Sequence, residues 1–197
     1  MSSARPGNCC SYPYIRHMKK ILAIPGSVRA SSSNHRLLRT IAEMTASELD
    51  VVIFSGLAGL PHFDPGVEDA PGPVVAFRQS LREADGVIIC TPEYAHGVPG
   101  SLKNAIDWTV SSGEFSGKLT VLITASTDGR FGHQALLETL GVIEARDVER
   151  LSLLIPFVRA KVNAETGVIE EKTLAEVRRL MDSFIATLKG ATPSTGG

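Results

Sequence analysis

The sequence predicts a doubly wound α/β domain, in which a five-stranded parallel sheet of order 2-1-3-4-5 carries helices on both faces. Five short apolar runs rich in β-branched residues are spread along the chain. Unbroken runs of this kind are typical of strands that are covered on both faces. Segments with helical periodicity separate the runs. Right-handed crossovers between consecutive strands then give three layers, and 2-1-3-4-5 is a common order for five strands.

The five predicted strands are the runs ILAI, VVIF, VIIC, LTVLIT and LSLLI, at residues 21–24, 51–54, 87–90, 119–124 and 151–155. Helical periodicity is clearest after the first, third and fifth runs. Its apolar positions are Leu37, Ile41 and Met44, then Leu102, Ala105, Ile106, Thr109 and Val110, then Leu174, Val177, Leu180, Met181, Phe184, Ile185 and Leu188. Weaker helical patterns follow the other two runs, at residues 74–84 and 134–145.

The composition is that of one ordinary globular domain. The chain has 197 residues, of which 43% are hydrophobic and 21% are charged, so it has enough apolar material for one sizeable core. We expect residues 18–190 to form this domain. Residues 1–17 and 191–197 lack apolar periodicity and are expected to be disordered tails.

Charge and cysteine content argue against several classes of protein. A net charge of -1 has none of the basic excess that binding to nucleic acid requires. No run of about 18 apolar residues is present that could span a membrane. The cysteines Cys9, Cys10 and Cys90 show neither a disulfide framework nor the spacing of a metal site. We therefore expect a soluble, cytoplasmic protein without a metal.

The turn after the first predicted strand, GSVRASSSN, is unusually rich in hydrogen-bond donors. In doubly wound sheets, ligands bind beyond the carboxyl ends of the strands, at the point where the strand order reverses. A turn that leads into a helix also offers free backbone N–H groups and the positive end of the helix dipole. The turn therefore predicts a site for a terminal phosphate, held by Ser27, Arg29, Ser32, Ser33 and Asn34. The alternative is a serine-rich helix cap, and for Asn34 alone the two interpretations are equally supported.

The stretch TPEYAHGVPGSLKNAIDW follows the third predicted strand, at residues 91–108. Its first half would present backbone amides and the ring of Tyr94 at the same crevice, where a flat heterocycle could lie. Packing is an equal alternative for Tyr94 and the favoured interpretation for Trp108. Surface solvation or helix capping is the alternative for Lys103, Asn104 and Asp107.

Together, the two stretches resemble the NAD(P)H-dependent FMN reductase family, which has a flavodoxin-like fold. The first is similar to the phosphate loop G-S-x-R-x-x-S-x-N of that family, and the second to its segment P-E-Y-x-x-x-x-P-G-x-L-K-N-A-I-D-W. The likeness extends from Lys19 to about Leu188. It implies an enzyme that binds FMN, takes a hydride from NADPH or NADH, and reduces small acceptors such as quinones, azo dyes, free flavin, nitroaromatics or chromate.

The resemblance also implies a role for each motif residue. The turn at residues 26–34 would hold the FMN phosphate. The isoalloxazine ring would be bordered by Pro92, Glu93, Tyr94, His96, Ser126, Asp128 and Gly129. The last three belong to STDGRFG, which corresponds to a glycine pair in the family. Asp128 stands where a glycine is usual, and a carboxylate beside the ring would disfavour the anionic reduced flavin unless it pointed away.

The leading prediction is therefore an FMN-dependent oxidoreductase with a ping-pong mechanism and no essential acid or base from the protein. One alternative is a flavodoxin-type electron carrier, although such carriers are usually strongly acidic and this chain is nearly neutral. Another is a flavin-binding sensor without turnover. The resemblance further implies a homodimer or homotetramer, with the helix at residues 102–110 as the expected interface.

Overall fold

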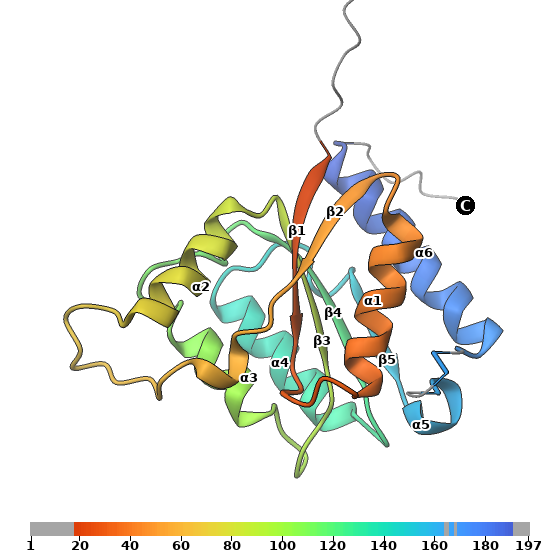
Figure 1. Cartoon of the computed structure of the whole chain (residues 1–197), viewed down its shortest axis with the longest axis horizontal. Coiled ribbons are helices and arrows are strands. Elements are labelled where there is room, and N and C mark those ends of the chain that lie inside the picture. The colour runs from red at the N-terminus through yellow and green to blue at the C-terminus, as the bar shows by residue number, and fades with distance from the viewer. Residues whose placement is uncertain (1–17, 164–165, 168, 191–197) are drawn as a thin grey trace, which may run out of the picture.

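The five apolar runs form a parallel sheet of order β2-β1-β3-β4-β5, which confirms the predicted topology (Figure 1). The strands are β1 (Lys19–Pro25), β2 (Leu49–Ile53), β3 (Gly86–Thr91), β4 (Leu119–Ala125) and β5 (Ser152–Ile155). The structure is a computed structural model that describes residues 18–163, 166–167 and 169–190. The tails predicted at residues 1–17 and 191–197 lie outside the described residues.

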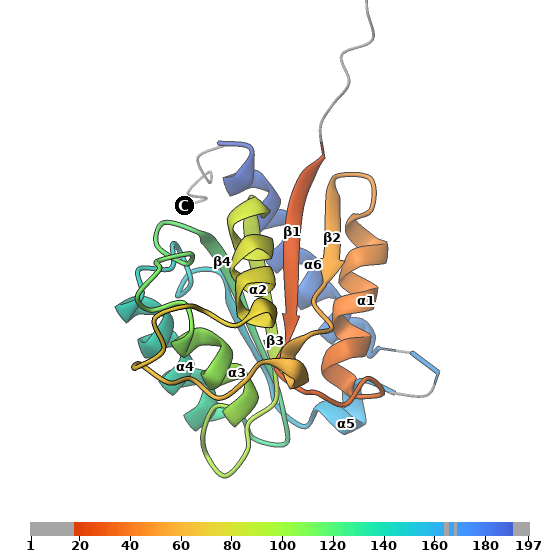
Figure 2. The same ribbon diagram turned by 60° about the vertical axis from the view of Figure 1, so that its left-hand side comes forward.

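Helices cover both faces of the sheet, as Figures 1 and 2 show. They are α1 (Ser33–Thr45), α2 (Gly72–Glu83), α3 (Gly100–Asp107), α4 (Arg130–Val142), α5 (Val158–Lys161) and α6 (Glu171–Leu188), with a short 3-10 turn η1 (Leu57–Gly59). Helices α1 and α6 lie on one face, and α2, α3 and α4 lie on the other. The helix predicted up to Val110 ends at Asp107. A turn follows it, in which the Thr109 N–H (2.8 Å) and hydroxyl (2.7 Å) both donate to the Ile106 carbonyl.

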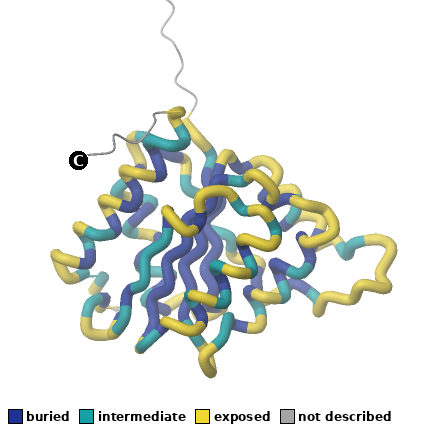
Figure 3. The backbone as a smooth tube through the Cα atoms, turned by 180° about the vertical axis from the view of Figure 1, so that it is seen from behind, coloured by how far each residue is buried: buried dark blue, intermediate teal, exposed yellow. Residues whose placement is uncertain are grey.

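Successive strand residues alternate between two apolar cores, as the pleat of a strand requires. Ile21 and Ala23 pack in the core under α1 and α6, whereas Leu22 and Ile24 pack in the core under α2 and α3. The central strands form the buried centre of the molecule in Figure 3. The prediction of strands covered on both faces is wrong for β2. This strand lies at the edge of the sheet, and its Val52 side chain is 42% exposed.

A close approach between β1 and β3 positions the two motif loops side by side. The Gly26 N–H donates to the Cys90 carbonyl at 2.8 Å, at the carboxyl ends of both strands. A Cβ at Gly26 would lie 2.1 Å from Thr91 Oγ1, so only glycine fits there. The turn at residues 26–34 and the loop that begins at Pro92 therefore leave the sheet at the same point, at its lower edge in Figure 1.

Candidate cofactor-binding cleft

A cleft of about 220 Å³ lies at the carboxyl edge of the sheet, between the loops that follow β1, β3, β4 and β5. It is lined by Ser27, Arg29, Ser32, Ser33, Asn34, Pro92, Glu93, Tyr94, Ala125, Ser126, Thr127, Val158 and Arg159. The structure thus brings together most of the residues singled out from the sequence. The exceptions are His96, Asp128 and Gly129, which do not line this cleft.

The turn at residues 26–34 is folded by its own hydrogen bonds. Ser32 is the N-cap of α1, and its Oγ accepts from the backbone N–H of His35 at 3.3 Å. Ser27 Oγ accepts from the backbone N–H of Arg29 at 3.3 Å. The His35 ring lies 3.0 Å from the Ser27 carbonyl through Nε2, and a carbonyl can only accept, so this nitrogen donates. These contacts hold the serines of the turn at the start of α1.

Asn34 links α1 to the sheet. Its side chain is 3% exposed, Nδ2 donates to the Ala125 carbonyl at 3.2 Å, and Oδ1 accepts from the Cys90 thiol at 3.3 Å. Burial raises the pKa of Cys90, which keeps the thiol protonated as a donor. Much of the hydrogen-bonding capacity of this side chain is therefore used within the protein. What remains for a ligand is the backbone N–H and the second amide hydrogen.

The opposite wall of the cleft is fixed by Glu93 and Ser126. The Glu93 backbone N–H donates to Ser126 Oγ at 3.1 Å, which joins the loop after β3 to the end of β4. The Glu93 carboxylate accepts from the backbone N–H of Gly132 at 2.6 Å, in the first turn of α4. A carboxylate at this position stabilises the helix through its dipole. Glu93 thus directs its charge toward α4.

A tight turn at Tyr94–Gly97 forms the rim of the cleft. The Tyr94 N–H donates to the Gly97 carbonyl (3.1 Å), and the Gly97 N–H donates back to the Tyr94 carbonyl (2.9 Å). Both central residues are left-handed, with φ of 48° at Ala95 and 57° at His96. This conformation costs about 1–2 kcal/mol for a residue other than glycine, and such strain is concentrated at functional sites. The turn leaves the Tyr94 ring 59% exposed.

The three predicted residues outside the lining have other contacts. The His96 ring stacks on Phe131 at 4.5 Å between ring centroids. The Asp128 carboxylate accepts two hydrogen bonds from Arg130, at 2.8 and 3.0 Å, and these bonds hold the pKa of Asp128 below its usual value. Gly129, at φ 93°, is the N-cap of α4. The charge of Asp128 is thus compensated by a neighbouring cation.

The second half of the 91–108 motif lies away from the cleft and holds another loop. Asn104 Nδ2 and Trp108 Nε1 both donate to the Pro61 carbonyl, at 2.9 and 2.8 Å. Asn104 Oδ1 accepts from the Phe63 N–H at 2.7 Å. Trp108 is buried, as the sequence indicates. These motif residues therefore stabilise the connection between η1 and α2.

The loop after β5 contributes a wall of the cleft that the sequence did not predict. Two backbone hydrogen bonds hold this loop, from the Phe157 N–H to the Thr127 carbonyl and from the Val158 N–H to the Ser126 carbonyl, both 3.0 Å. They bring Arg159 to the cleft. The available signal was an arginine four residues after the end of the last predicted strand. The motifs at residues 26–34, 91–108 and 126–132 follow the first, third and fourth predicted strands, and none of them contains Arg159.

The charge of the cleft favours an anion. Arg29 and Arg159 line it, and neither forms an ion pair with another residue in the described part of the chain. Glu93, the carboxylate of the lining, is bound to the first turn of α4. The hydroxyls of the 26–34 turn add neutral donors. Fold and site thus define a doubly wound α/β protein with a cationic, hydroxyl-lined cleft where the strand order reverses.

Comparison with known proteins places this chain in a family. Residues 19–159 match the family model of NADPH-dependent FMN reductase. A quinone reductase of Escherichia coli K12 is 32% identical over 175 residues, which cover 84% of this chain and 93% of that protein. An NAD(P)H-dependent FMN reductase of Pseudomonas aeruginosa is 30% identical over 173 residues, which cover 84% and 92%. The chain therefore belongs to the NADPH-dependent FMN reductase family, and it is an enzyme of the NAD(P)H-dependent FMN and quinone reductase type.

Solved structures confirm the flavodoxin-like fold. The flavoenzyme FerB, an NAD(P)H:acceptor oxidoreductase from Paracoccus denitrificans, superimposes with a TM-score of 0.71 at 22% identity, covering 88% of this chain and 99% of that chain. The apo form of an NADH:FMN oxidoreductase gives a TM-score of 0.68 at 19% identity, covering 90% and 94%.

Proposed function

We propose that this chain binds FMN in the cleft and uses NADPH or NADH to reduce a small acceptor such as a quinone, in a ping-pong mechanism. FMN, when bound, supplies the redox chemistry, because it accepts electrons from a nicotinamide and passes them to an acceptor. The observation that carries the proposal is the pair of arginines without ion-pair partners among the described residues, beside the hydroxyl-rich start of α1. The other groups of the cleft are consistent with it.

The donors of the cleft fit a phosphate monoester. The N–H groups of the first helical turn have no intrahelical partners, and the helix dipole favours negative charge there. Ser32 caps one of these N–H groups itself, at His35, which leaves those of Ser33 and Asn34 for a ligand. Arg29 adds a planar guanidinium, whose fork of donors matches phosphate oxygens.

The loop after β3 fits the flat ring of the cofactor. Its backbone at Glu93 is fixed by the hydrogen bond to Ser126, so its amide groups have a defined position. The exposed Tyr94 ring stands at the rim, where it can contact the isoalloxazine or a substrate. A carboxylate at Asp128 would oppose an anionic reduced flavin if its charge were uncompensated. Its pairing with Arg130 compensates that charge.

The ping-pong order is proposed because only one face of the bound ring would be open to substrates. We propose that the walls at residues 92–94 and 126–127 cover one face of the ring. Nicotinamide and acceptor then use the remaining face in turn, so the first product must leave before the second substrate binds. The protein contributes binding and orientation, and no side chain is needed as an acid or base.

Spectroscopy of the reconstituted protein tests this function. Anaerobic NADPH should bleach the yellow absorbance of the bound flavin, and a quinone added afterwards should restore it. Steady-state rates at several quinone concentrations should give parallel double-reciprocal lines. The proposal fails if no flavin binds under any reconstitution, or if neither NADPH nor NADH reduces the bound flavin.

We also propose a homo-oligomer, which gel filtration tests directly. The helix expected at the interface buries Leu102, Ala105 and Ile106 in the core of its own subunit, so of its large apolar side chains only Val110, in the turn after the helix, is well exposed. A monomer at all working concentrations would contradict the proposal. In the described part of the chain, no helix combines the length and the apolar character needed to cross a membrane.

A further inference from the structure

We propose that Arg159 is a second cation for the phosphate of FMN. Together with Arg29, it would make the cleft select FMN over riboflavin. The inference rests on the proposed function, because it assumes that FMN is the ligand. It adds a residue from the loop after β5, which neither motif contains. Four observations support it.

The first observation is that the backbone holds Arg159 in place. The N–H groups of Phe157 and Val158 donate to the carbonyls of Thr127 and Ser126, which fastens the start of α5 to the end of β4. Phe157 adopts a left-handed conformation with φ of 55°, and this reverses the chain direction directly after β5. Val158 is 6% exposed and anchors the short helix in the core. Arg159 is therefore presented from a fixed backbone.

The second observation is that α5 lies beside the start of α1. Asn34 in the first turn of α1 donates to the Ala125 carbonyl, and Val158 in α5 donates to the carbonyl of the next residue, Ser126. Both helices are thus bonded to the same end of β4. Figures 1 and 2 show α5 next to the lower end of α1 from two directions. Arg159 consequently faces the cleft from the end where the phosphate is proposed to bind.

The third observation is that Arg159 forms no ion pair with any residue that the structure describes. The Glu93 carboxylate in the same lining is bound to Gly132. Since Glu93 forms no ion pair with Arg159, the guanidinium is available to a ligand.

The fourth observation concerns the charge that a phosphate monoester brings. Such a group carries about -1.5 to -2 charges at neutral pH. Arg29 provides one positive charge and the N-terminus of α1 about half of another. Together they supply about 1.5 positive charges, which leaves up to about half a negative charge of a dianion uncompensated. A second guanidinium offsets this remainder and leaves the occupied site slightly positive. This argument favours the phosphate over the ring, since oxidised flavin carries no charge that would need a second arginine.

The affinity ratio between FMN and riboflavin tests the inference, because the two ligands differ only in the phosphate. Fluorescence titration would give the Kd of each ligand for the wild type, Arg159→Gln and Arg159→Lys. We expect Arg159→Gln to weaken FMN binding about tenfold to a hundredfold, as for the loss of a charge-assisted hydrogen bond, and to change riboflavin binding less than about twofold. Arg159→Lys should recover part of the loss, because it keeps the charge without the fork of donors. Arg178→Gln, at an exposed position on α6, is the matched control and should change neither affinity.

Two results would overturn the inference while the proposed function stands. In one, Arg159→Gln binds FMN as the wild type does. In the other, it loses FMN and riboflavin affinity equally at an unchanged melting temperature, which would assign Arg159 to the ring. If the wild type itself binds no flavin, the proposed function and the inference fail together. Reduction of the FMN bound to the wild-type protein by NADPH shows that the proposed function stands, and it therefore distinguishes these outcomes.

Discussion

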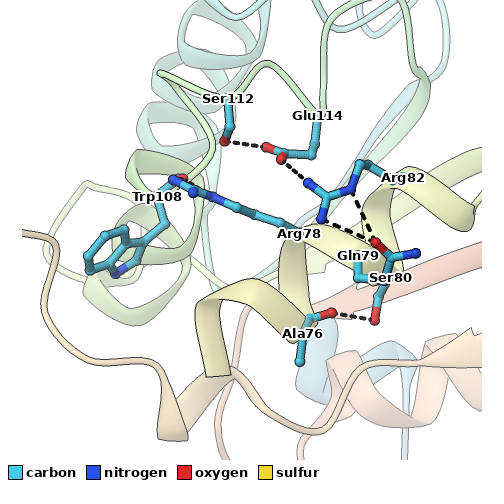
Figure 4. A network of polar contacts seen from close by, with 8 residues as sticks. All are labelled: Ala76, Arg78, Gln79, Ser80, Arg82, Trp108, Ser112 and Glu114. Carbon is cyan, nitrogen blue, oxygen red and sulfur yellow. Dashed lines mark hydrogen bonds and ion pairs between the residues drawn. The ribbon is translucent and has the colours of Figure 1, made fainter. Parts of the chain in front are cut away.

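The cleft and the polar cluster between α2 and the segment after α3 are similar in composition but differ in what their charges contact. In the cluster, Arg82 pairs with Glu114 at 2.8 Å, and Ser112 donates to the same carboxylate at 2.6 Å (Figure 4). Arg78 Nε donates to the Trp108 carbonyl at 2.8 Å. In the cleft, Arg29 and Arg159 have no such carboxylate among the described residues.

This difference separates residues that stabilise the fold from residues that are available to a ligand. The side chain of Glu114 is 1% exposed, and a buried carboxylate is tolerated only where cations and donors surround it. The cluster therefore satisfies its own groups. The guanidinium groups of the cleft remain available for an anion. Substitutions in the first region should change stability, and substitutions in the second should change affinity.

The largest effect is expected at the close approach between β1 and β3, which positions the two loops of the cleft. Gly26→Ala would place a Cβ 2.1 Å from Thr91 Oγ1. The clash should lower the free energy of unfolding by about 3 kcal/mol, at the upper end of the cost of overpacking. Chemical denaturation measures it. Gly141→Ala in α4, where a Cβ meets no atom within 4 Å, is the control and should stabilise the protein slightly. Equal stability of the two variants would contradict the packing described at Gly26.

Arg82→Ala tests whether the polar cluster at Glu114 stabilises the fold without affecting ligand affinity. It removes the cation that pairs with the buried Glu114. The loss for a fully buried pair is about 3–5 kcal/mol, and because the Arg82 side chain is half exposed, we expect about 2 kcal/mol. FMN affinity, measured on the folded variant, should not change. Arg179→Ala on α6 provides the comparison for an exposed arginine. A loss of FMN affinity in Arg82→Ala would show that the two regions are not separate.

Ser33→Ala tests the ligand side. It removes a hydroxyl of the cleft lining that is not the cap of α1. We expect FMN affinity to fall about tenfold with unchanged stability, since a hydrogen bond to a charged group is lost only in the complex. Ser32→Ala should differ, because Ser32 also caps the helix, and it should lower stability by about 1 kcal/mol as well. Full FMN affinity in both variants would contradict the assignment of the phosphate to this turn.

The smallest effect is expected at the rim of the cleft. Ala95→Gly places glycine at a position with φ of 48°. Relief of the left-handed strain exceeds the added entropy of the unfolded chain, so thermal unfolding should show a gain of about 0.5–1 kcal/mol. A destabilised variant would contradict the strain assigned to the turn at Tyr94–Gly97.

The sheet and the two loops at its switch point could be predicted because strong local signals encode them. Continuous apolar runs identify buried strands, and the order of strands and helices restricts the topology. The exposure of Val52 on β2 was less predictable, although the predicted order already places this strand at the edge. Its run is as apolar as the others, but exposure at an edge depends on which neighbours the sheet provides.

The individual roles of the site residues could be predicted only in part. Ser27, Ser32 and Ser33 lie in one cleft because they share one turn. The roles of Glu93 and Asn104 depend on partners distant in sequence, at Gly132 and Pro61, and no spacing rule reveals those contacts. Arg159 reaches the cleft through hydrogen bonds between its own loop and the loop after β4, and these bonds leave no pattern in the sequence.

The central claim is that the cleft binds a flavin through its phosphate, and competition between FMN and riboflavin for the wild-type protein tests it most directly. Two guanidinium groups and several hydroxyls should contact the phosphate, so the Kd for FMN should be lower than that for riboflavin by at least about a hundredfold. This preference should shrink at high salt, because exposed charges are screened. Equal affinities for FMN and riboflavin would contradict the account.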